Sequence, residues 1–598
     1  MGKIVPVNVP PGAYRNGTEY QSQGRWRDVN LVRWHEGSMK PHTGWGQSTT
    51  EYGMTGQVFS HSGAFNTIGQ GEPIGCIAWQ DNSDNSWYAW TMDTGGQWVM
   101  EDDGTLHNLG DSNSFGTTSD WAHWDTFGEI PLMCANSNGR IYEWDLNTAN
   151  AFTEVTNAPT DCVGLVVADE RFVLALKKRE VAWCDRDDRT VWTAAATNQA
   201  GSFPLDTEGE LMAGLQMRGE VLIISSRDAF SARYVGYPDV WEFRRIGRCT
   251  LLGGNAVARV DDRAFWWGDD GFYTYSGGYV QKIPCDVWDY VSGDLSDYTN
   301  ALTTSRRRTF AWHNSDFGEV VWQYYTATSG ADKYVAYNYL NNSWSYGESP
   351  IGCVAPKIPF EFNLGTPDIQ NRLSHSYSSD PGYTLGTNWQ IGGGTLDQSA
   401  PTASAASYDL TGLPANWPIV IWINTSGRTV GTLTVTGTTM SPITVTADEQ
   451  YATYGRTDAS GAFTITFTGD GTYDGGVTKT DIYDYPVINV EDGSYEYTNV
   501  TNAPYAKSGP IELAPGESRV HVTRLIPDTQ DSGELDFTFT TREYPTATET
   551  THGPYTAANP TSVRFSGRQF TMKVEPAATG VDWRSGIHRL EISKGGKR

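Results

Sequence analysis

Apolar and polar residues alternate with a period of two through most of this chain, and the alternation breaks at Gly, Asn or Asp pairs. That period is typical of β-strands, whose successive side chains point to opposite faces of a sheet, and the breaks are typical of hairpin turns. Helical patterns are sparse. A chain of 598 residues is too long for one ordinary core, so we predict an all-β protein of roughly two to four domains.

A loose unit recurs between residues 55 and 385, in which an aromatic-rich strand, a short polar turn and a second strand follow one another. Examples are 86–109, 139–155, 179–194, 268–283 and 333–347. Their spacing, roughly 40–60 residues, is close to the period of propeller blades. We therefore predict a degenerate β-propeller over 55–385. Its blade number stays open, because the sequence carries neither a WD40 nor a kelch signature.

The composition changes near residue 386. From 386 to 483 the chain is rich in Thr, Gly, Ser and Ala and poor in Lys and Arg, and its strand patterns alternate cleanly. These features predict an Ig-like β-sandwich inserted into another domain. Residues 1–54 are interpreted as an N-terminal arm that leads into the propeller and plugs or latches it. Residues 484–598 are interpreted as a C-terminal antiparallel β-domain that completes the body.

The formal net charge is −27. Binding to nucleic acid by counterion release needs positive charge, so the balance argues against a DNA-wrapping role and against adsorption to anionic membranes. It is compatible with a wall past which DNA slides, because like charges repel. The seven cysteines include no CxxC pair and are interpreted as reduced core residues made in a cytoplasm. The sequence has neither a hydrophobic leader nor a run long enough to span a membrane, so we expect no membrane insertion.

The search for chemistry yields no enzyme motif. The ten histidines are scattered, and the acidic stretches 81–86 and 185–188 fail the EF-hand pattern and are interpreted as Asx-rich turns. We therefore predict no catalytic residue, no metal and no cofactor.

A carbohydrate-binding or glycan-degrading propeller stays open as the alternative. A glycosidase needs two carboxylates about 5–10 Å apart. Asp269, Asp270 and Glu319 could supply them, and the nearby aromatic residues that could stack on sugar rings are Trp266, Trp267, Trp322 and Tyr324.

The densest aromatic and charged segment is GRWRDVNLVRWHEGSMKPHTGW, residues 24–45. Three tryptophans so close together are not expected all to stay in water. We predict a structural anchoring cluster formed by Trp26, Asp28, Arg33, Trp34 and Trp45, in which Arg33 and its neighbouring arginines could pair with Asp28 and Glu36.

The same run, extended back to Gly12, resembles the opening of tail-tube proteins of short-tailed (podovirus-type) bacteriophages, where a Trp-Asp-apolar-Val-Arg strand and a Gly-rich turn end in Gly-Trp. Segments 215–236 and 248–278 are similar to the tail nozzle, or packaged-DNA stabilisation, family. Segments 509–528, 562–575 and 583–592 resemble that family's closing β-domain. The resemblance covers most of the chain except about 386–483.

The resemblance implies a structural virion protein, assembled in the host cytoplasm and located in the virion tail. It would form a homohexameric nozzle below the portal and adaptor rings, with tail spikes or fibres attached nearby. The nozzle would extend the channel for double-stranded DNA, retain the packaged genome and open for ejection, without sequence-specific DNA contacts. A tail-associated glycan-binding or glycan-degrading propeller is the alternative function. A trimeric receptor-binding protein would carry a fibrous repeat, which is not seen.

Overall fold

The computed structural model describes most of the chain. The described residues are 2–47, 59–60, 71–93, 95–102, 104–109, 119–295, 306–326, 333–349, 351–360, 363–367, 371–379, 382–401, 403–413, 417–438, 440, 442–448, 450–484, 489–491, 503–512, 518–530, 535–544, 547–558, 560–578 and 580–595. The chain divides into two compact units. Unit 1 comprises 1–59, 73–367 and 488–598, and unit 2 comprises 60–72 and 368–487.

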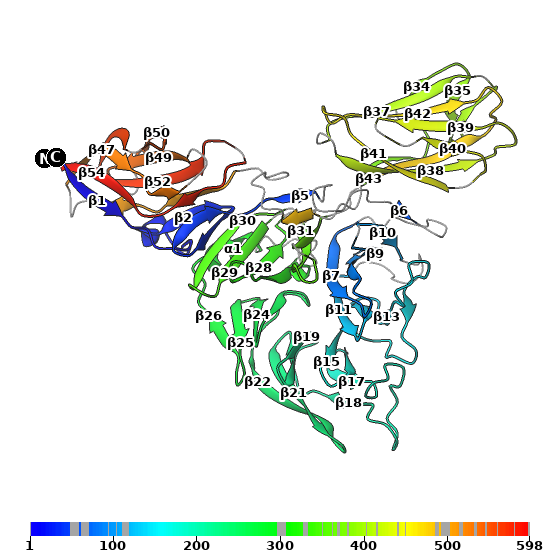
Figure 1. Ribbon diagram of the computed structural model, residues 1–598, viewed down its shortest axis with the longest axis horizontal. Coiled ribbons are helices and arrows are strands. Elements are labelled where there is room, and N and C mark those ends of the chain that lie inside the picture. The colour runs from blue at the N-terminus through cyan, green and yellow to red at the C-terminus, as the bar shows by residue number, and fades with distance from the viewer. Residues whose placement is uncertain are drawn as a thin grey trace. The chain divides into compact units, whose positions relative to one another are not determined.

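Unit 1 contains a β-propeller built from antiparallel blades of four strands, and the sheet of the first blade also includes β6 (Phe59–Ser60) beside β10 (Leu106–Asn108) (Figure 1). The first three blades are β7–β10 (Pro73–Gln80, Ser86–Met92, Gln97–Met100, Leu106–Asn108), β11–β14 (Ala122–Phe127, Ile130–Ala135, Ile141–Glu143, Thr153–Glu154) and β15–β18 (Gly164–Ala168, Phe172–Leu176, Glu180–Trp183, Gly201–Pro204). The next three are β19–β22 (Leu211–Met217, Glu220–Ser225, Asp228–Gly236, Val240–Arg248), β23–β26 (Val257–Val260, Arg263–Gly268, Gly271–Tyr275, Gln281–Ile283) and β27–β30 (Phe310–Asn314, Glu319–Tyr324, Lys333–Asn338, Ser343–Glu348). Each of these blades is a simple meander in chain order.

The last blade draws its strands from three distant parts of the chain. It has the order β31 (Ile351–Ala355), β32 (Leu364–Pro367), β44 (Asn489–Glu491) and β5 (Trp45–Gln47). The first strand of each blade lies beside the first strand of the next, and β31 lies beside β7. Within the described residues the propeller is therefore a closed ring of seven blades, and an N-terminal strand completes the last one.

Close contact between neighbouring inner strands depends on glycine. A Cβ atom on Gly75 of β7 would lie 2.1 Å from the carbonyl oxygen of Ala122 on β11. A Cβ atom on Gly164 of β15 would lie 2.1 Å from Nδ1 of His123. Real Cβ atoms do not approach so closely, so the spacing of the inner strands requires that these positions carry no side chain.

The N-terminal and C-terminal segments fold together into one terminal β-domain. Its sheets have the orders β1-β54-β47-β51, β2-β45-β52-β49-β50 with β46 beside β52, and β3-β4-β53-β48. The N-terminal strands are β1 (Lys3–Val7), β2 (Trp26–Asn30), β3 (Val32–His35) and β4 (Ser38–Pro41), with a 3-10 helix η1 (Glu19–Ser22). The C-terminal strands are β45 (Tyr505–Ser508), β46 (Ile511–Glu512), β47 (Val520–Ile526), β48 (Thr529–Gln530), β49 (Leu535–Arg542), β50 (Thr550–Thr556), β51 (Thr561–Gly567), β52 (Gln569–Pro576), β53 (Arg584–Ser585) and β54 (His588–Lys594).

Because β1 pairs with β54, the two ends of the chain lie together (Figure 1). One continuous hydrophobic core joins this domain to the propeller, since Trp26 and Phe539 belong to the same buried cluster as Trp266 and Trp322. The first 41 residues thus build the terminal β-domain, and β5 alone enters a blade.

Unit 2 consists of two sheets around a shared buried core. One sheet has the order β35-β36-β43-β38-β41 with β33 beside β43, and the other has the order β34-β37-β42-β39-β40. The strands are β33 (Asn371–His375), β34 (Thr384–Leu385), β35 (Trp389–Gly392), β36 (Thr395–Gln398), β37 (Ala405–Leu410), β38 (Pro418–Ser426), β39 (Leu433–Gly437), β40 (Ile443–Val445), β41 (Gln450–Arg456), β42 (Phe463–Gly469) and β43 (Gly476–Asp484). In chain order this unit falls between β32 and β44 of the last blade. Its Ig-like class stays a prediction.

Candidate functional site

Residues 24–45, named here the anchoring segment, contribute side chains to the core where the terminal β-domain meets the sixth blade. Trp26 and Trp34 are 4% and 3% exposed and belong to the same buried cluster. The carbonyl oxygen of Trp34 accepts a hydrogen bond from the Nδ2 atom of Asn338 at 3.4 Å. Burying two indole rings here removes a large apolar area from water, which stabilises this junction.

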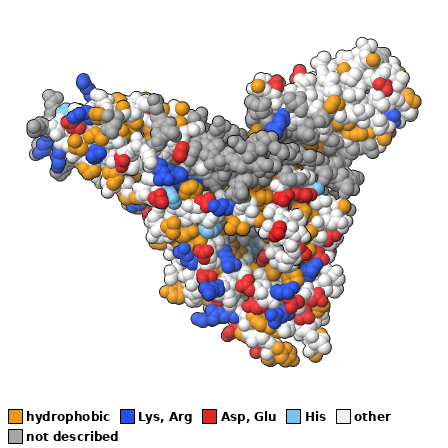
Figure 2. Space-filling model, viewed as in Figure 1, with side chains coloured by type: hydrophobic (Ala, Val, Ile, Leu, Met, Phe, Trp, Pro, Cys, Tyr) orange, Lys and Arg blue, Asp and Glu red, His pale blue; other side chains and the backbone are white. Residues whose placement is uncertain are grey.

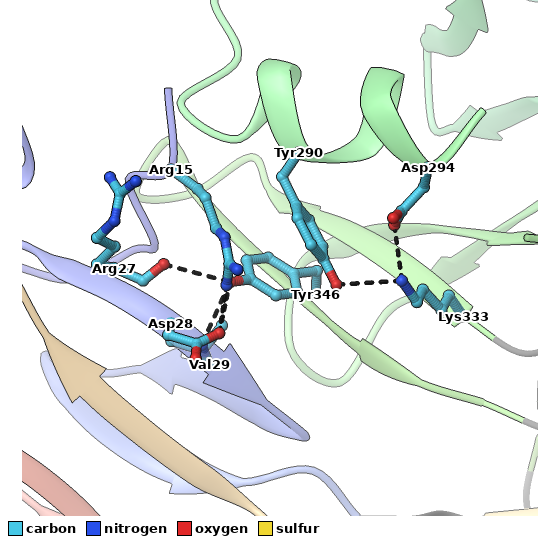
Figure 3. A network of polar contacts seen from close by, with 8 residues as sticks. All are labelled: Arg15, Arg27, Asp28, Val29, Tyr290, Asp294, Lys333 and Tyr346. Carbon is cyan, nitrogen blue, oxygen red and sulfur yellow. Dashed lines mark hydrogen bonds and ion pairs between the residues drawn. The ribbon is translucent and has the colours of Figure 1, made fainter. Parts of the chain in front are cut away.

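A network of polar contacts crosses the same junction, formed by Arg15, Asp28, Tyr290, Lys333 and Tyr346 and named here the junction network (Figure 3). Arg15 is ion-paired with Asp28 of β2 and donates a hydrogen bond to the hydroxyl of Tyr346 at 2.6 Å. Its guanidinium lies 4.5 Å from the ring centroid of Tyr290, on helix α1 (Trp288–Asp294). Lys333 donates to the hydroxyl of Tyr290 at 3.2 Å.

The electrostatics of this network hold Arg15 in its charged form. Burial opposes that charge, but Tyr346 and Asp28 outweigh burial and raise the pKa of Arg15. Burial also raises the pKa of Tyr346, which therefore stays a neutral hydroxyl. Because Arg15 and Asp28 keep 30% and 38% of their side chains exposed, we assign the network to orientation of the joined elements and not to a large stabilisation.

Arg33 lies in a separate, fully buried pocket. Its Nε atom is 3.6 Å from Oε2 of Glu319, and both side chains are at most 2% exposed. The guanidinium is 3.8 Å from the ring centroid of Phe317, and Nη2 is 2.7 Å from Nδ1 of His42. Burial and the neighbouring Arg33 charge hold the pKa of His42 well below its ordinary value, so the imidazole is neutral.

The ion pairs expected within 24–45 are wrong. Asp28 pairs with Arg15, and Arg33 pairs with Glu319 of the sixth blade. Glu36 lies 3.8 Å from Arg584. The reason is that β2 and β3 enter different sheets, so Arg33 and Glu36 meet partners that are far away in the sequence, while Asp28 meets Arg15 from the segment before β2.

Trp45 lies apart from the other two tryptophans of the segment. It belongs to β5 and packs edge-to-face on Trp312, with ring centroids 6.2 Å apart. It borders a different core group, shared by the sixth and last blades. The structure therefore brings Trp26 and Trp34 into one core, and places Asp28, Arg33 and Trp45 at three other contacts of the same N-terminal segment.

A polar cavity of about 150 Å³ lies among the inner strands of the propeller. Asp125, His123 and Asn255 line it. Burial raises the pKa of Asp125 to about 6, although the backbone N–H groups of Val167 and Thr126 each donate to its carboxylate at 2.8 Å. Burial lowers the pKa of His123 to about 4. Ligand pockets for drug-sized molecules are about 300–1,000 Å³, so this cavity has room only for water or for a very small molecule.

The structure does not bring the residues of the glycosidase alternative into one accessible site. Trp266, Trp267 and Trp322 are fully buried and cannot stack on a sugar. Glu319 is buried against Arg33. Asp270 lies in a turn, where it accepts hydrogen bonds from Tyr273 at 2.6 Å and Lys282 at 3.1 Å.

No local pattern in the sequence marks Arg15, Tyr290, Lys333 and Tyr346 as a group, because Arg15 and Tyr346 are 331 positions apart and meet only in the folded chain. The sequence does contain one local sign that the first and last blades are related. The tetrapeptide Pro-Ile-Gly-Cys occurs at 73–76 and again at 350–353, which fall at the first strands of the first and last blades.

The surface of the propeller carries no single-sign face in the view of Figure 2, where acidic and basic side chains are interspersed over the blades. Among the described residues, no group of three or more His, Cys, Asp or Glu side chains is placed to hold a metal ion. The part of the chain that the structure describes also contains no helix of the length and hydrophobicity that crossing a membrane requires.

Comparison with known proteins finds solved structures of low similarity. No protein-family model matches the chain, and no curated protein matches it. A streptogramin B lyase is similar with 8% identity and a TM-score of 0.34, over 50% of this chain and 92% of the lyase. The Pan2 WD40 domain of Neurospora crassa is similar with 6% identity and a TM-score of 0.31, over 50% of this chain and 86% of that domain.

Proposed function

We propose that the chain is a structural subunit of the tail nozzle of a short-tailed bacteriophage. In this role six copies surround the DNA channel below the portal and adaptor, retain the packaged genome and open for ejection. Tail spikes or fibres attach nearby, and the subunit assembles in the host cytoplasm and functions in the virion tail. The chain acts as a scaffold and catalyses no reaction.

The observation that carries the proposal is the continuity of the body. The N-terminal and C-terminal strands that resemble the nozzle family share sheets with each other, and one buried core joins them to the propeller. The segment outside the resemblance, 386–483, lies within unit 2. A channel wall under the pressure of packaged DNA needs such a joined body, since separately hinged domains would yield.

The net charge of −27 supports the same role. A ring of acidic subunits repels DNA phosphate and limits adhesion during passage, while contacts between subunits and with the adaptor fix the position. Against the glycan-processing alternative stands the burial of the tryptophans that would have stacked on sugar.

The experiment is native mass spectrometry of the purified chain, alone and after mixing with a portal–adaptor complex. The expected result is no closed ring alone and six copies on each complex. A parallel glycan-array measurement with the labelled chain tests the alternative. Saturable binding to one glycan class, together with no uptake onto the portal–adaptor complex, contradicts the proposal.

A further inference from the structure

The repeated tetrapeptide places two cysteines at equivalent positions in the first and last blades. Cys76 lies on β7 and Cys353 lies on β31, the two inner strands that meet where the propeller ring closes. Each follows a glycine. A Cβ atom on Gly352 would lie 2.6 Å from Cγ of Pro73, so the two strands run in close contact beside the cysteines.

The side chains of Cys76 and Cys353 interact, and burial followed by the hydrogen bond to Cys76 raises the pKa of Cys353. They share a small polar group with the hydroxyls of Tyr88 and Thr366, whose oxygens are 2.5 Å apart. A disulfide needs Cβ atoms about 3.5–4.5 Å apart. A disulfide between Cys76 and Cys353 requires that these two side chains, on strands that lie beside each other, reach this geometry.

The two thiols differ in access. Cys353 is fully buried, and burial raises its pKa, which keeps it a protonated thiol. Cys76 is partly exposed and lines the polar axial cavity of about 150 Å³. A small oxidant in that cavity therefore meets Cys76 and not Cys353, which does not line the cavity.

We propose that Cys76 and Cys353 are a redox-controlled staple that closes the propeller ring covalently when the protein meets a small peroxide. The Cys76 thiol gives up its proton and its sulfur attacks one oxygen of hydrogen peroxide. The O–O bond breaks and the departing hydroxide takes up that proton, so the products are a Cys76 sulfenic acid and one water. The Cys353 sulfur then attacks the sulfenic sulfur, its proton leaves with the hydroxyl as a second water, and the S–S bond forms. Two thiols and one peroxide give one disulfide and two waters.

The staple joins residues that are 277 positions apart in the chain, counted from Cys76 to Cys353. It joins the inner strands of the first and last blades, while β5 pairs with β44 at the outer edge of the last blade. A crosslink that spans so long a segment restricts the unfolded chain strongly. The inference does not depend on the proposed nozzle function.

The chain offers a matched control in Cys134 and Cys162. These thiols are also in hydrogen-bonding contact, but both are at most 1% exposed, and neither lines the axial cavity. If access through the cavity controls oxidation, this second pair stays reduced in the native protein.

The test treats the full-length reduced protein with hydrogen peroxide, quenches it, alkylates free thiols under denaturing conditions and maps the peptides by mass spectrometry. We expect a crosslinked Cys76–Cys353 peptide, no Cys134–Cys162 crosslink, and a higher thermal midpoint that dithiothreitol reverses. The variant Cys353→Ala should lose the crosslink and leave a Cys76 sulfenic acid that dimedone traps. Alkylated Cys76 and Cys353 after treatment, or equal crosslinking of both pairs, would overturn the proposal.

The variant Cys249→Ala is the control for a general effect of removing a buried thiol, because Cys249 is buried elsewhere in the propeller core. This variant should keep the Cys76–Cys353 crosslink. If Cys353→Ala has lost native far-ultraviolet circular dichroism, the wild-type peptide map and the reversal by dithiothreitol decide the matter alone.

Discussion

At the residue scale, the burial of aromatic side chains in the N-terminal segment could be predicted from the sequence, whereas its ion pairs could not. Trp26 and Trp34 were expected to leave water, and both lie in the core. The pairing of Arg33 was beyond the sequence, because Glu319 is nearly 300 positions away and reaches Arg33 only through the sixth blade. A local sequence pattern can predict that an aromatic side chain is buried. It cannot predict which distant carboxylate forms an ion pair with a buried arginine.

Trp34→Ala tests the anchoring role. Replacing a buried tryptophan by alanine removes apolar burial and leaves a cavity, so the free energy of unfolding should fall by about 3–5 kcal/mol. The measurement is urea unfolding followed by fluorescence and circular dichroism. The matched control is Tyr279→Ala, which removes a ring that is 67% exposed and should change the stability little. Equal stability of the two variants would refute the anchor.

Asp125→Asn tests the polar cavity through its pH dependence. Burial raises the pKa of Asp125 to about 6, so the folded state holds a proton that the unfolded state releases near pH 4. The stability that this proton gives is full below about pH 4 and is lost as the pH rises through 6. Asparagine stays neutral throughout.

The variant should therefore gain stability relative to wild type as the pH rises from 4 to 6, by up to roughly 3 kcal/mol, with a plateau above. Comparing the two proteins removes the contribution of His123, whose lowered pKa acts in the opposite direction over the same range. Denaturant unfolding at a series of pH values measures the difference. A difference that stays flat with pH would show that Asp125 is solvated.

At the scale of elements, strand alternation predicted the all-β fold and the propeller, while the way the ring closes was hidden. Strand β5 is three residues long, and β44 is also three residues long. Such short strands carry no periodic signal. Strand β44 pairs with β32 and β5 pairs with β44 only because the rest of the ring brings them together. The repeated Pro-Ile-Gly-Cys was the one local sign that the first and last blades are neighbours.

Trp45→Ala tests the closure by β5. The indole packs on Trp312, and the missing side chain of Gly365 leaves room for it, since a Cβ atom there would lie 2.9 Å from the ring. Loss of this contact should increase amide hydrogen exchange in β31, β32 and β44, with the second and third blades unchanged. Leu340→Ala, at a side chain that is 70% exposed on the sixth blade, is the control and should leave exchange unaltered. Uniform faster exchange in every blade would contradict a local closure.

Gly164→Ala tests the packing of inner strands. An added methyl would lie 2.1 Å from the His123 ring, so we expect a loss of about 1–3 kcal/mol from overpacking. In α1, a Cβ atom on Gly293 would have no neighbour within 4 Å, and Gly293→Ala should be neutral or slightly stabilising. Thermal unfolding of the two variants measures the difference in stability. Equal thermal midpoints would show that the inner strands move apart to accommodate the added methyl group.

At the scale of the whole molecule, the proposed role rests on a body whose two ends fold together. The terminal β-domain takes strands from both ends of the chain, and the anchoring segment and the junction network connect it to the sixth blade. The sequence could not reveal that the first 41 residues belong with the last hundred, because strand pairing between chain ends leaves no local trace. The composition change near 386 did indicate a separate region in the middle of the chain.

A cryo-electron reconstruction of intact virions, with no symmetry imposed below the portal, tests the central claim most directly. The account predicts six copies of this chain around a channel that contains DNA, with the terminal β-domain and propeller of each copy fitting the density as one body. Copies found in threes at the periphery, or as isolated propellers with the axial cavity facing outward, would contradict it.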